Sequence, residues 1–448
     1  MSRIGIVGGG VLGMELAAKL TRHGHQVTIL EAAPRSGGLT APAQIGPYTW
    51  DRFYHVVLQS DEYLRKLLDE LGLTQKLQWR PTGTGFYVDG RLQSLSSTLD
   101  FVTFPALGLW DKARLGATIL YASRLKNWAH LETISAGEWL SRWSGRRAWE
   151  RLWLPLLRAK LGENALVASA AFIWAIIARM YGARRTGMKR ETFGYVDGGY
   201  AAILRRFDEH LAGLGVTCEY GVRVGEVRNV NGQVIVTTTT GVREFDNIVL
   251  TIPCSRIVDT CPQLTEAERI RLRAIRYQGI VCAALLLEQP LANYYITNIA
   301  DSAVPFTAVI EMTAIVDRSR FGGNALVYLP KYLAQEESFW EKTDSEIEEM
   351  FLRGLEGMYP RFQRQHVKAF QISRVREMLA VTTLNYSATL LPATRTSIEG
   401  VFIINSAQIA AATLNVNETL ALAQRKAQEV EPLLISPRAQ APGRVGAA

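Results

Sequence analysis

The sequence is poor in the residues that build disulfides and metal sites. Its 448 residues include four cysteines, Cys218, Cys254, Cys261 and Cys282, with no CxxC spacing and no histidine cluster near them. This pattern predicts small buried thiols in a reducing compartment and no bound metal. The first apolar run begins within three residues of the N-terminus, so we expect no signal peptide and a cytoplasmic location.

Long apolar runs and blocks of like charge are also missing. The longest uncharged apolar run, Ala165 to Ala178, is shorter than the roughly 20 residues that cross a bilayer, and we interpret it as a buried or interfacial helix. The formal net charge is +8, but no basic block has the residue types and spacing of a nucleic-acid module. An anionic substrate or an anionic membrane surface therefore explains the charge better than nucleic acid does.

The overall composition is that of a globular protein. Hydrophobic residues make up 48% of the chain and charged residues 21%, which is typical of a protein with a large core. At this length two domains are expected. No internal repeat and no linker divides the halves.

The first 38 residues carry the most informative motif. Arg3 to Val7 is a short apolar run, followed by Gly8-Gly9-Gly10-Val11-Leu12-Gly13 and a segment of helical periodicity. A second apolar run, Gln26 to Leu30, ends on Glu31. The pattern predicts a strand, a glycine-rich turn, a helix and a second strand that ends in an acid.

Each part of this motif has a physical role in binding a dinucleotide. Gly8 permits a tight turn, Gly10 lets the backbone approach a pyrophosphate, and Gly13 lets the helix pack closely on the strand. The helix N-terminus offers unpaired N–H groups to the phosphates, and Glu31 is placed to bind a ribose. A glycine-rich turn without a ligand is the alternative. The surrounding strand, helix and acid favour the dinucleotide.

The segment Glu31-Ala32-Ala33-Pro34-Arg35-Ser36-Gly37-Gly38 resembles the double-glycine signature of the flavin-containing amine oxidase superfamily. That group includes protoporphyrinogen oxidases and phytoene desaturases. The resemblance implies FAD, whereas the spacing alone predicts only a dinucleotide. It also implies an α/β fold: a Rossmann-like FAD-binding domain assembled from discontinuous segments, plus an α+β substrate domain with a helical, Trp-rich insertion.

Three later segments resemble the same superfamily. Tyr220 to Val227 is similar to the strand whose valine backbone pairs with the adenine, here Val224. Gly400 to Ile409 is similar to a strand that ends in Gly-Asp in relatives, and Asn405-Ser406 here removes that negative charge. The helix after it would point its N-terminus at the flavin. The residues that the motif and the resemblance assign to FAD are Gly8, Gly9, Gly10, Val11, Leu12, Gly13, Glu31, Ala32, Arg35, Gly37, Gly38, Leu39, Val224, Asn405, Ser406, Asn415 and Val416.

The resemblance divides the chain into interleaved domains. The FAD-binding domain would comprise residues 1–85, 191–258 and 386–435. The substrate domain would comprise a helical part, 86–190, and a sheet, 259–385. The tail, 436–448, is expected to be disordered.

Three residues are candidates for the chemistry. His55 ends a segment that in relatives passes the flavin ring, although a core histidine is an equal alternative. Glu311 lies in an apolar strand pattern, where a carboxylate is either salt-bridged or in contact with substrate. Lys160 lies in Leu152 to Gly162, which resembles a "PLL…KFG" stretch of protoporphyrinogen-oxidase-like enzymes.

The resemblance implies an FAD-dependent oxidoreductase that abstracts a hydride from a lipophilic substrate. The net positive charge would also suit an anionic lipid as the substrate. One alternative is a non-redox mutase of a sugar nucleotide, which would use arginines such as Arg158, Arg184, Arg185 and Arg374. Another is an FAD-free binding protein of the GDP-dissociation-inhibitor type. The Trp-rich helices with Lys112, Arg114, Arg124 and Lys126 predict either a solvated face or peripheral membrane contact.

Overall fold

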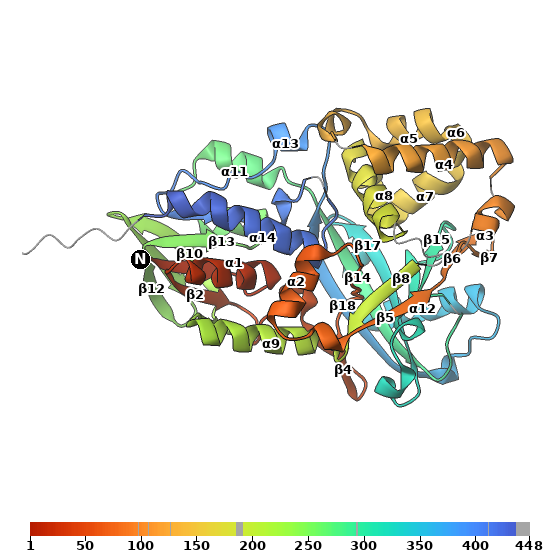
Figure 1. Ribbon diagram of the computed structural model, residues 1–448, viewed down its shortest axis with the longest axis horizontal. Helices are drawn as coiled ribbons and strands as arrows, with labels where there is room; N and C mark the ends of the chain where they lie inside the picture. Colours follow the sequence, from red (N-terminus) through yellow and green to blue (C-terminus); the bar gives the residue numbers. More distant parts are fainter. Residues whose placement is uncertain are drawn as a thin grey trace, which may run out of the picture.

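The computed structural model of the chain describes residues 1–96, 98–105, 107–125, 127–184, 191–292, 294–410 and 412–435 (Figure 1). The predictions for Lys126, Arg185 and the tail 436–448 lie outside these residues, as does the side chain of Arg184. The described chain forms two large sheets and a group of helices.

The first large sheet is parallel and has the strand order β19-β13-β1-β2-β9. Numbered along the chain, this order is that of a Rossmann sheet, with the first strand at its centre. The strands come from widely separated parts of the sequence, as the resemblance predicts. Their bounds are β1 (Arg3–Val7), β2 (Gln26–Glu31), β9 (Thr217–Tyr220), β13 (Asn247–Leu250) and β19 (Val401–Ile403).

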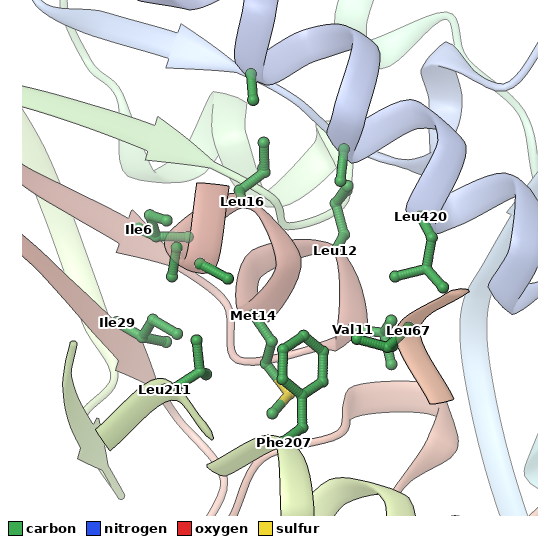
Figure 2. Close-up of a cluster of buried hydrophobic side chains, with 14 of the residues drawn as sticks. Ile6, Val11, Leu12, Met14, Leu16, Ile29, Leu67, Phe207, Leu211 and Leu420 are labelled. Atoms are coloured by element: carbon green, nitrogen blue, oxygen red, sulfur yellow. The ribbon is translucent and has the colours of Figure 1, made fainter. Parts of the chain in front are cut away.

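Both faces of this sheet are covered, so its inner strands β13, β1 and β2 are mostly apolar and buried. Successive residues face opposite sides. Ile29 packs among the helices on one face, and Leu30 packs against the antiparallel strands that cover the other face. Figure 2 shows side chains from the sheet and four helices meeting around Met14 of the first helix. These helices are α1 (Val11–Arg22), α2 (Glu62–Glu70), α9 (Gly199–Leu214) and α14 (Val416–Val430).

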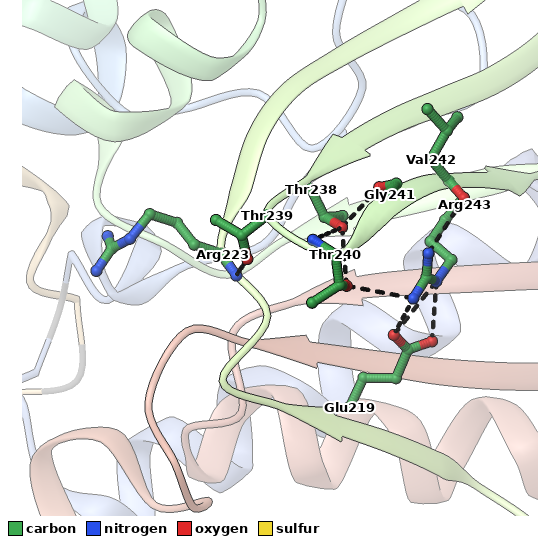
Figure 3. A network of polar contacts seen from close by, with 8 residues as sticks. All are labelled: Glu219, Arg223, Thr238, Thr239, Thr240, Gly241, Val242 and Arg243. Carbon is green, nitrogen blue, oxygen red and sulfur yellow. Dashed lines mark hydrogen bonds and ion pairs between the residues drawn. The ribbon is translucent and has the colours of Figure 1, made fainter.

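The opposite face carries a three-stranded antiparallel meander and two short helices. An ion pair joins the meander to the edge strand of the parallel sheet, with Arg243 Nη2 2.9 Å from a carboxylate oxygen of Glu219 (Figure 3). Arg243 lies on the last strand of the meander, so the contact joins that strand to the edge of the parallel sheet. The elements are β10 (Val224–Val230), β11 (Gln233–Thr238), β12 (Gly241–Phe245), α10 (Cys254–Thr260) and α11 (Glu266–Arg273).

The second large sheet has seven strands in the order β18-β14-β17-β16-β15-β6-β7, and only β15 and β6 pair in parallel. We call it the roof sheet. Its second strand, β14, is fully buried: Val281 packs toward α12, and Ile280 packs toward residues 45–58. The bounds are β6 (Thr84–Val88), β7 (Arg91–Ser94), β14 (Tyr277–Leu287), β15 (Ile296–Ile299), β16 (Ala308–Glu311), β17 (Ala325–Ala334), β18 (Val367–Ala380) and α12 (Asp344–Met358).

Asp89 and Gly90, a residue pair typical of two-residue hairpin turns, join β6 to β7 with φ of 51° and 70°. This hairpin belongs to the roof sheet, whereas the domain scheme placed it with the helical part. Two further pairs of strands form small sheets of their own. They are β3 (Pro42–Ile45) with β4 (Tyr48–Asp51), and β5 (Leu77–Thr82) with β8 (Glu191–Val196).

The Trp-rich segment is helical, as expected, and gathers at one corner of the molecule (Figure 1). Trp139 and Trp153 are core residues, but Trp110 and Trp143 are exposed. Among the described residues, no helix is long and apolar enough to cross a membrane. The helices are α3 (Thr98–Thr103), α4 (Leu109–Arg124), α5 (Ala136–Ser144), α6 (Arg146–Ala148), α7 (Leu154–Leu161) and α8 (Ala170–Arg184), with α13 (Tyr386–Thr389) elsewhere.

Candidate cofactor cradle and active site

The glycine-rich turn lies at the carboxyl edge of the parallel sheet. Gly8 follows β1 with φ of +113°, a conformation that favours glycine. Gly13 lies in the first turn of α1, where a Cβ atom would be 2.0 Å from the carbonyl oxygen of Gly8. Only a hydrogen fits at that position, and α1 can therefore lie directly against the end of β1.

The double glycine packs on this turn. Gly10 and Gly37 form a parallel bridge, and the Gly37 N–H donates to the Gly9 carbonyl at 2.8 Å. A Cβ on Gly38 would be 3.2 Å from the Gly10 Cα. We call Gly8 to Gly13 with Gly37 and Gly38 the glycine cradle. It presents bare backbone at the start of α1, which suits a pyrophosphate.

Glu31 closes one side of the cradle at the end of β2. Its carboxylate accepts the Gly9 N–H at 2.6 Å and the Ala33 N–H at 2.7 Å. These bonds hold the carboxylate beside the turn, in the place where the motif expects a ribose. Ala32 and Arg35 in the following loop are exposed to solvent, and Leu39 packs against the apolar cluster below the roof sheet.

Two helices begin at this edge, because β1 and β19 are parallel strands of one sheet. Helix α1 has Gly10 as its N-cap residue, with no side-chain cap bond. Helix α14 packs along α1 and begins after Asn415, whose side chain accepts the Glu418 N–H. Val416 is its first residue. Both positive helix ends therefore point to the same side of the sheet.

The side chain of Asn405 forms hydrogen bonds within the protein. Its side chain is 1% exposed, its amide donates to the Ile252 carbonyl at 2.9 Å, and its oxygen accepts the Ala407 N–H at 3.1 Å. It therefore ties the end of β19 to the end of β13. Of the Asn405-Ser406 pair, only Ser406 is accessible to a ligand. Val224 opens β10 at the same edge, two residues after Val222, whose N–H donates to the Glu31 carbonyl.

His55 lies at the junction of the cradle side and the roof sheet. It lines a pocket of about 10 Å³, room for about one water molecule, together with Asp51, Tyr195, Tyr200 and Met312. Burial lowers the pKa of His55 to about 4, so the imidazole is neutral at pH 7. Its Nδ1 atom is buried and has no hydrogen-bond partner within the described chain. This ring can orient a ligand, but it is a weak base.

Two residues beside His55 were missed by the sequence interpretation. Burial raises the pKa of Asp51 to about 7, and its carboxylate accepts the Tyr200 N–H at 2.7 Å. Arg52 donates to the carbonyl of Gly38 at 2.6 Å and so links the double glycine to this region. The sequence does single them out, because Asp51 and Arg52 are adjacent charged residues in an otherwise apolar and aromatic segment.

Lys160 approaches the same junction from helix α7. Its Nζ lies 5.5 Å from the centre of the Tyr332 ring on β17. The Tyr332 hydroxyl is in turn 2.5 Å from the hydroxyl of Tyr54, the neighbour of His55. The structure therefore brings the Lys160 region and the His55 region together.

Glu311 lies elsewhere. It occupies the face of β16 opposite Ile310 and Met312, so it does not meet His55. Its carboxylate is 2% exposed and accepts the N–H groups of Leu291 and Ala292 at 2.9 and 2.7 Å. Within the described part of the chain, the contacts of this carboxylate are these two backbone N–H groups rather than a salt bridge. Glu311 therefore holds a backbone loop, and its candidate catalytic role stays a prediction.

Glu311 should make stability depend on pH. Burial raises its pKa to about 8, against 4.5 for an ordinary glutamate. The folded state thus holds a proton that the unfolded chain releases above pH 4.5, and stability contributed by this group falls as pH rises toward 8. We expect the wild type to lose unfolding free energy relative to Glu311→Gln, on the order of a few kcal/mol, between pH 5 and 8.5. Urea unfolding of both proteins at pH 5 and pH 8.5 checks this prediction. A difference in unfolding free energy between the two proteins that does not change with pH would contradict it.

Comparisons with known proteins agree with this geometry. A family model described as "Flavin containing amine oxidoreductase" matches residues 13–430. The mitochondrial protoporphyrinogen oxidase of Nicotiana tabacum is 34% identical over 77 residues, which is 17% of this chain and 15% of that protein. The similarity to curated relatives therefore spans about a sixth of their length.

Solved structures show the same fold over nearly the whole chain. A CLA-producing fatty acid isomerase from P. acnes has a TM-score of 0.73 at 17% identity, covering 97% of this chain and 99% of that chain. A putrescine oxidase bound to putrescine has a TM-score of 0.73 at 17% identity, covering 96% and 99%. At these identities the likeness shows the fold alone.

Proposed function

This chain belongs to the flavin-containing amine oxidoreductase family, in which the cofactor is FAD, and from that membership we propose a specific activity. The protein abstracts a hydride from a C–H bond of a lipophilic organic substrate. When bound, FAD supplies the hydride acceptor. The residues present fit the cofactor, since the cradle offers bare glycine backbone at the start of α1 with Glu31 beside it.

One observation supports the lipophilic substrate. The face of the roof sheet that looks toward the cradle is a cluster of apolar and aromatic side chains, and Leu39 of the cradle loop packs against it. Trp50, Phe53 and Tyr328 belong to this cluster. A substrate held there is shielded from water and rests on apolar surface, as C–H chemistry requires. The neutral His55 ring at its border orients the substrate through its unpartnered nitrogen.

Replacing His55 by alanine should retain the flavin and slow the reaction. The expected loss is about a hundredfold in the rate at which the first substrate found for the wild type reduces the flavin. Stopped-flow spectroscopy measures this rate. The exposed His130→Ala is the matched control and should behave as the wild type. An unchanged rate in His55→Ala would make His55 a core histidine.

We also propose that the helical corner touches an anionic lipid surface, as an enzyme of the cytoplasm would to reach a lipophilic substrate. Leu109 and Trp110, in the first turn of α4, are 75% and 76% exposed, and Val102 beside them is 48% exposed. Arg146 and Arg147 nearby pair with Glu150 and Asp111, at 2.7 and 3.9 Å, and Arg142 adds an exposed positive charge. An apolar tip with a basic border suits the interface of an anionic bilayer.

The double variant Leu109→Ser with Trp110→Ser should release the protein from lipid. We expect binding to phosphatidylglycerol vesicles to fall about tenfold or more in a sedimentation assay, because two large apolar side chains no longer enter the interface. Ile270→Ser, which removes a similarly exposed side chain from α11, should bind as the wild type. Equal loss in both variants would argue against this surface.

A further inference from the structure

A single cation lies against the double glycine of the cradle. Arg52 directly follows β4, and its Nη2 atom donates to the Gly38 carbonyl at 2.6 Å. Its Nε atom is buried and has no hydrogen-bond partner among the residues described. The guanidinium also forms no ion pair with any carboxylate of the described chain. Since this group carries five N–H donors, most of its hydrogen-bonding capacity is left for a ligand.

The groups beside Arg52 leave its charge uncompensated. The carboxylate of Asp51 accepts the Tyr200 N–H, and its raised pKa of about 7 leaves it only partly ionised at neutral pH. The pKa of His55 is lowered to about 4, so its imidazole is uncharged. Burial, and no neighbouring charge of the described chain, lowers the pKa of Arg52 itself. A partly buried cation in such surroundings is stabilised by an anion placed next to it.

The surface at this cation is open to a ligand and borders the roof sheet. Gly38 is exposed to solvent and Arg52 is partly exposed. Leu39, next to Gly38, packs against the apolar cluster below the roof sheet. Phe53, whose ring centre is 5.3 Å from the guanidinium carbon, belongs to that cluster. Glu31 lies at the end of β2, on the other side of the glycine-rich turn. Arg52 therefore marks the end of the cradle that faces the roof.

We propose that the Arg52 guanidinium stabilises the reduced flavin ring more than the oxidised ring and thereby raises the reduction potential of bound FAD. This inference rests on the proposed function, which requires FAD as the hydride acceptor. With its adenosine ribose at Glu31 and its pyrophosphate at the turn, FAD has its flavin on the side of Arg52. A hydride brings two electrons and one proton to a neutral ring and leaves one negative charge there. A fixed cation acts on that new charge far more than on the neutral ring.

The midpoint potential of the full-length protein, measured against a reference dye with FAD in excess, tests this assignment. Arg52→Gln removes the charge and keeps an amide that can donate to Gly38. We expect the preference for reduced over oxidised FAD to fall about tenfold, which lowers the potential by about 30 mV for a two-electron couple. Arg52→Lys keeps the charge and should keep the potential of the wild type. Arg205→Gln, at an exposed position of α9, is the matched control and should do the same.

Other roles of Arg52 give a different result. If Arg52 only holds Gly38, or if it binds the pyrophosphate, Arg52→Gln weakens both redox states of FAD equally, because neither contact changes on reduction. A yellow Arg52→Gln protein with an unchanged potential would therefore overturn the inference and leave the proposed function standing. If Arg52→Gln takes up no flavin, Arg52→Lys decides. An unchanged potential supports the charge, and one lowered by about 30 mV overturns it. A colourless wild type refutes the proposed function instead.

Discussion

Gly10→Val should fold normally and fail to bind FAD. Gly10 has φ of −73° and ψ of 171°, an extended conformation that valine adopts readily. A Cβ there meets nothing nearer than the Gly38 Cα at 3.9 Å, so the first side-chain atom meets no clash. The branched side chain would instead fill the space between the first turn and the double glycine, where the pyrophosphate lies in a motif of this kind. We expect FAD affinity to fall at least about a hundredfold.

Gly108→Val is the matched control for this experiment. Gly108 is the N-cap residue of α4, with φ of −71° and ψ of 165°, nearly the same backbone as Gly10. It is remote from the cradle, since α4 belongs to the helical corner (Figure 1). Flavin content after purification and far-UV circular dichroism are the two readouts. A yellow Gly10→Val protein with full FAD content would remove the cradle from the cofactor site.

Gly13→Ala should destabilise the protein itself. The added methyl group would lie 2.0 Å from the Gly8 carbonyl oxygen, a distance that no real Cβ atom shows. The helix must therefore move away from β1 and from the core around Met14 (Figure 2). We expect a loss of about 3 kcal/mol or more of unfolding free energy, at the upper end of overpacking effects.

The same substitution at another helical glycine should have the opposite sign. Gly116 lies in α4, and a Cβ there would have open space within 4 Å. Gly116→Ala should stabilise the protein by about 1 kcal/mol, because alanine favours the helix. Urea unfolding of both variants in the absence of FAD compares them directly. Similar free energies for the two variants would contradict the close packing inferred at Gly13.

Local features of the fold follow from the sequence, because their causes lie within a few residues. The glycines between β1 and α1 set a tight turn, and Asp89-Gly90 sets a hairpin. The buried roof strand β14 is an apolar run in the sequence. None of these three patterns depends on distant parts of the chain.

Contacts across the fold could not be predicted in this way. Lys160 meets Tyr332 and Arg179 meets Asp61 only after helices α7 and α8 pack on the roof sheet and on segment 51–61. The first turn of α2 has a partner from far along the chain, since Asn417 accepts the N–H of Tyr63. Arg179 does stand out in the sequence, because it is the first charged residue after the long apolar run of Ala165 to Ala178.

The direct test of the cofactor assignment is the absorption spectrum of the purified protein, recorded before and after anaerobic reduction and again after denaturation. We expect a yellow protein that bleaches on reduction and releases about one FAD per chain, since the glycine cradle forms one site. A folded, colourless protein that takes up no added FAD would contradict it.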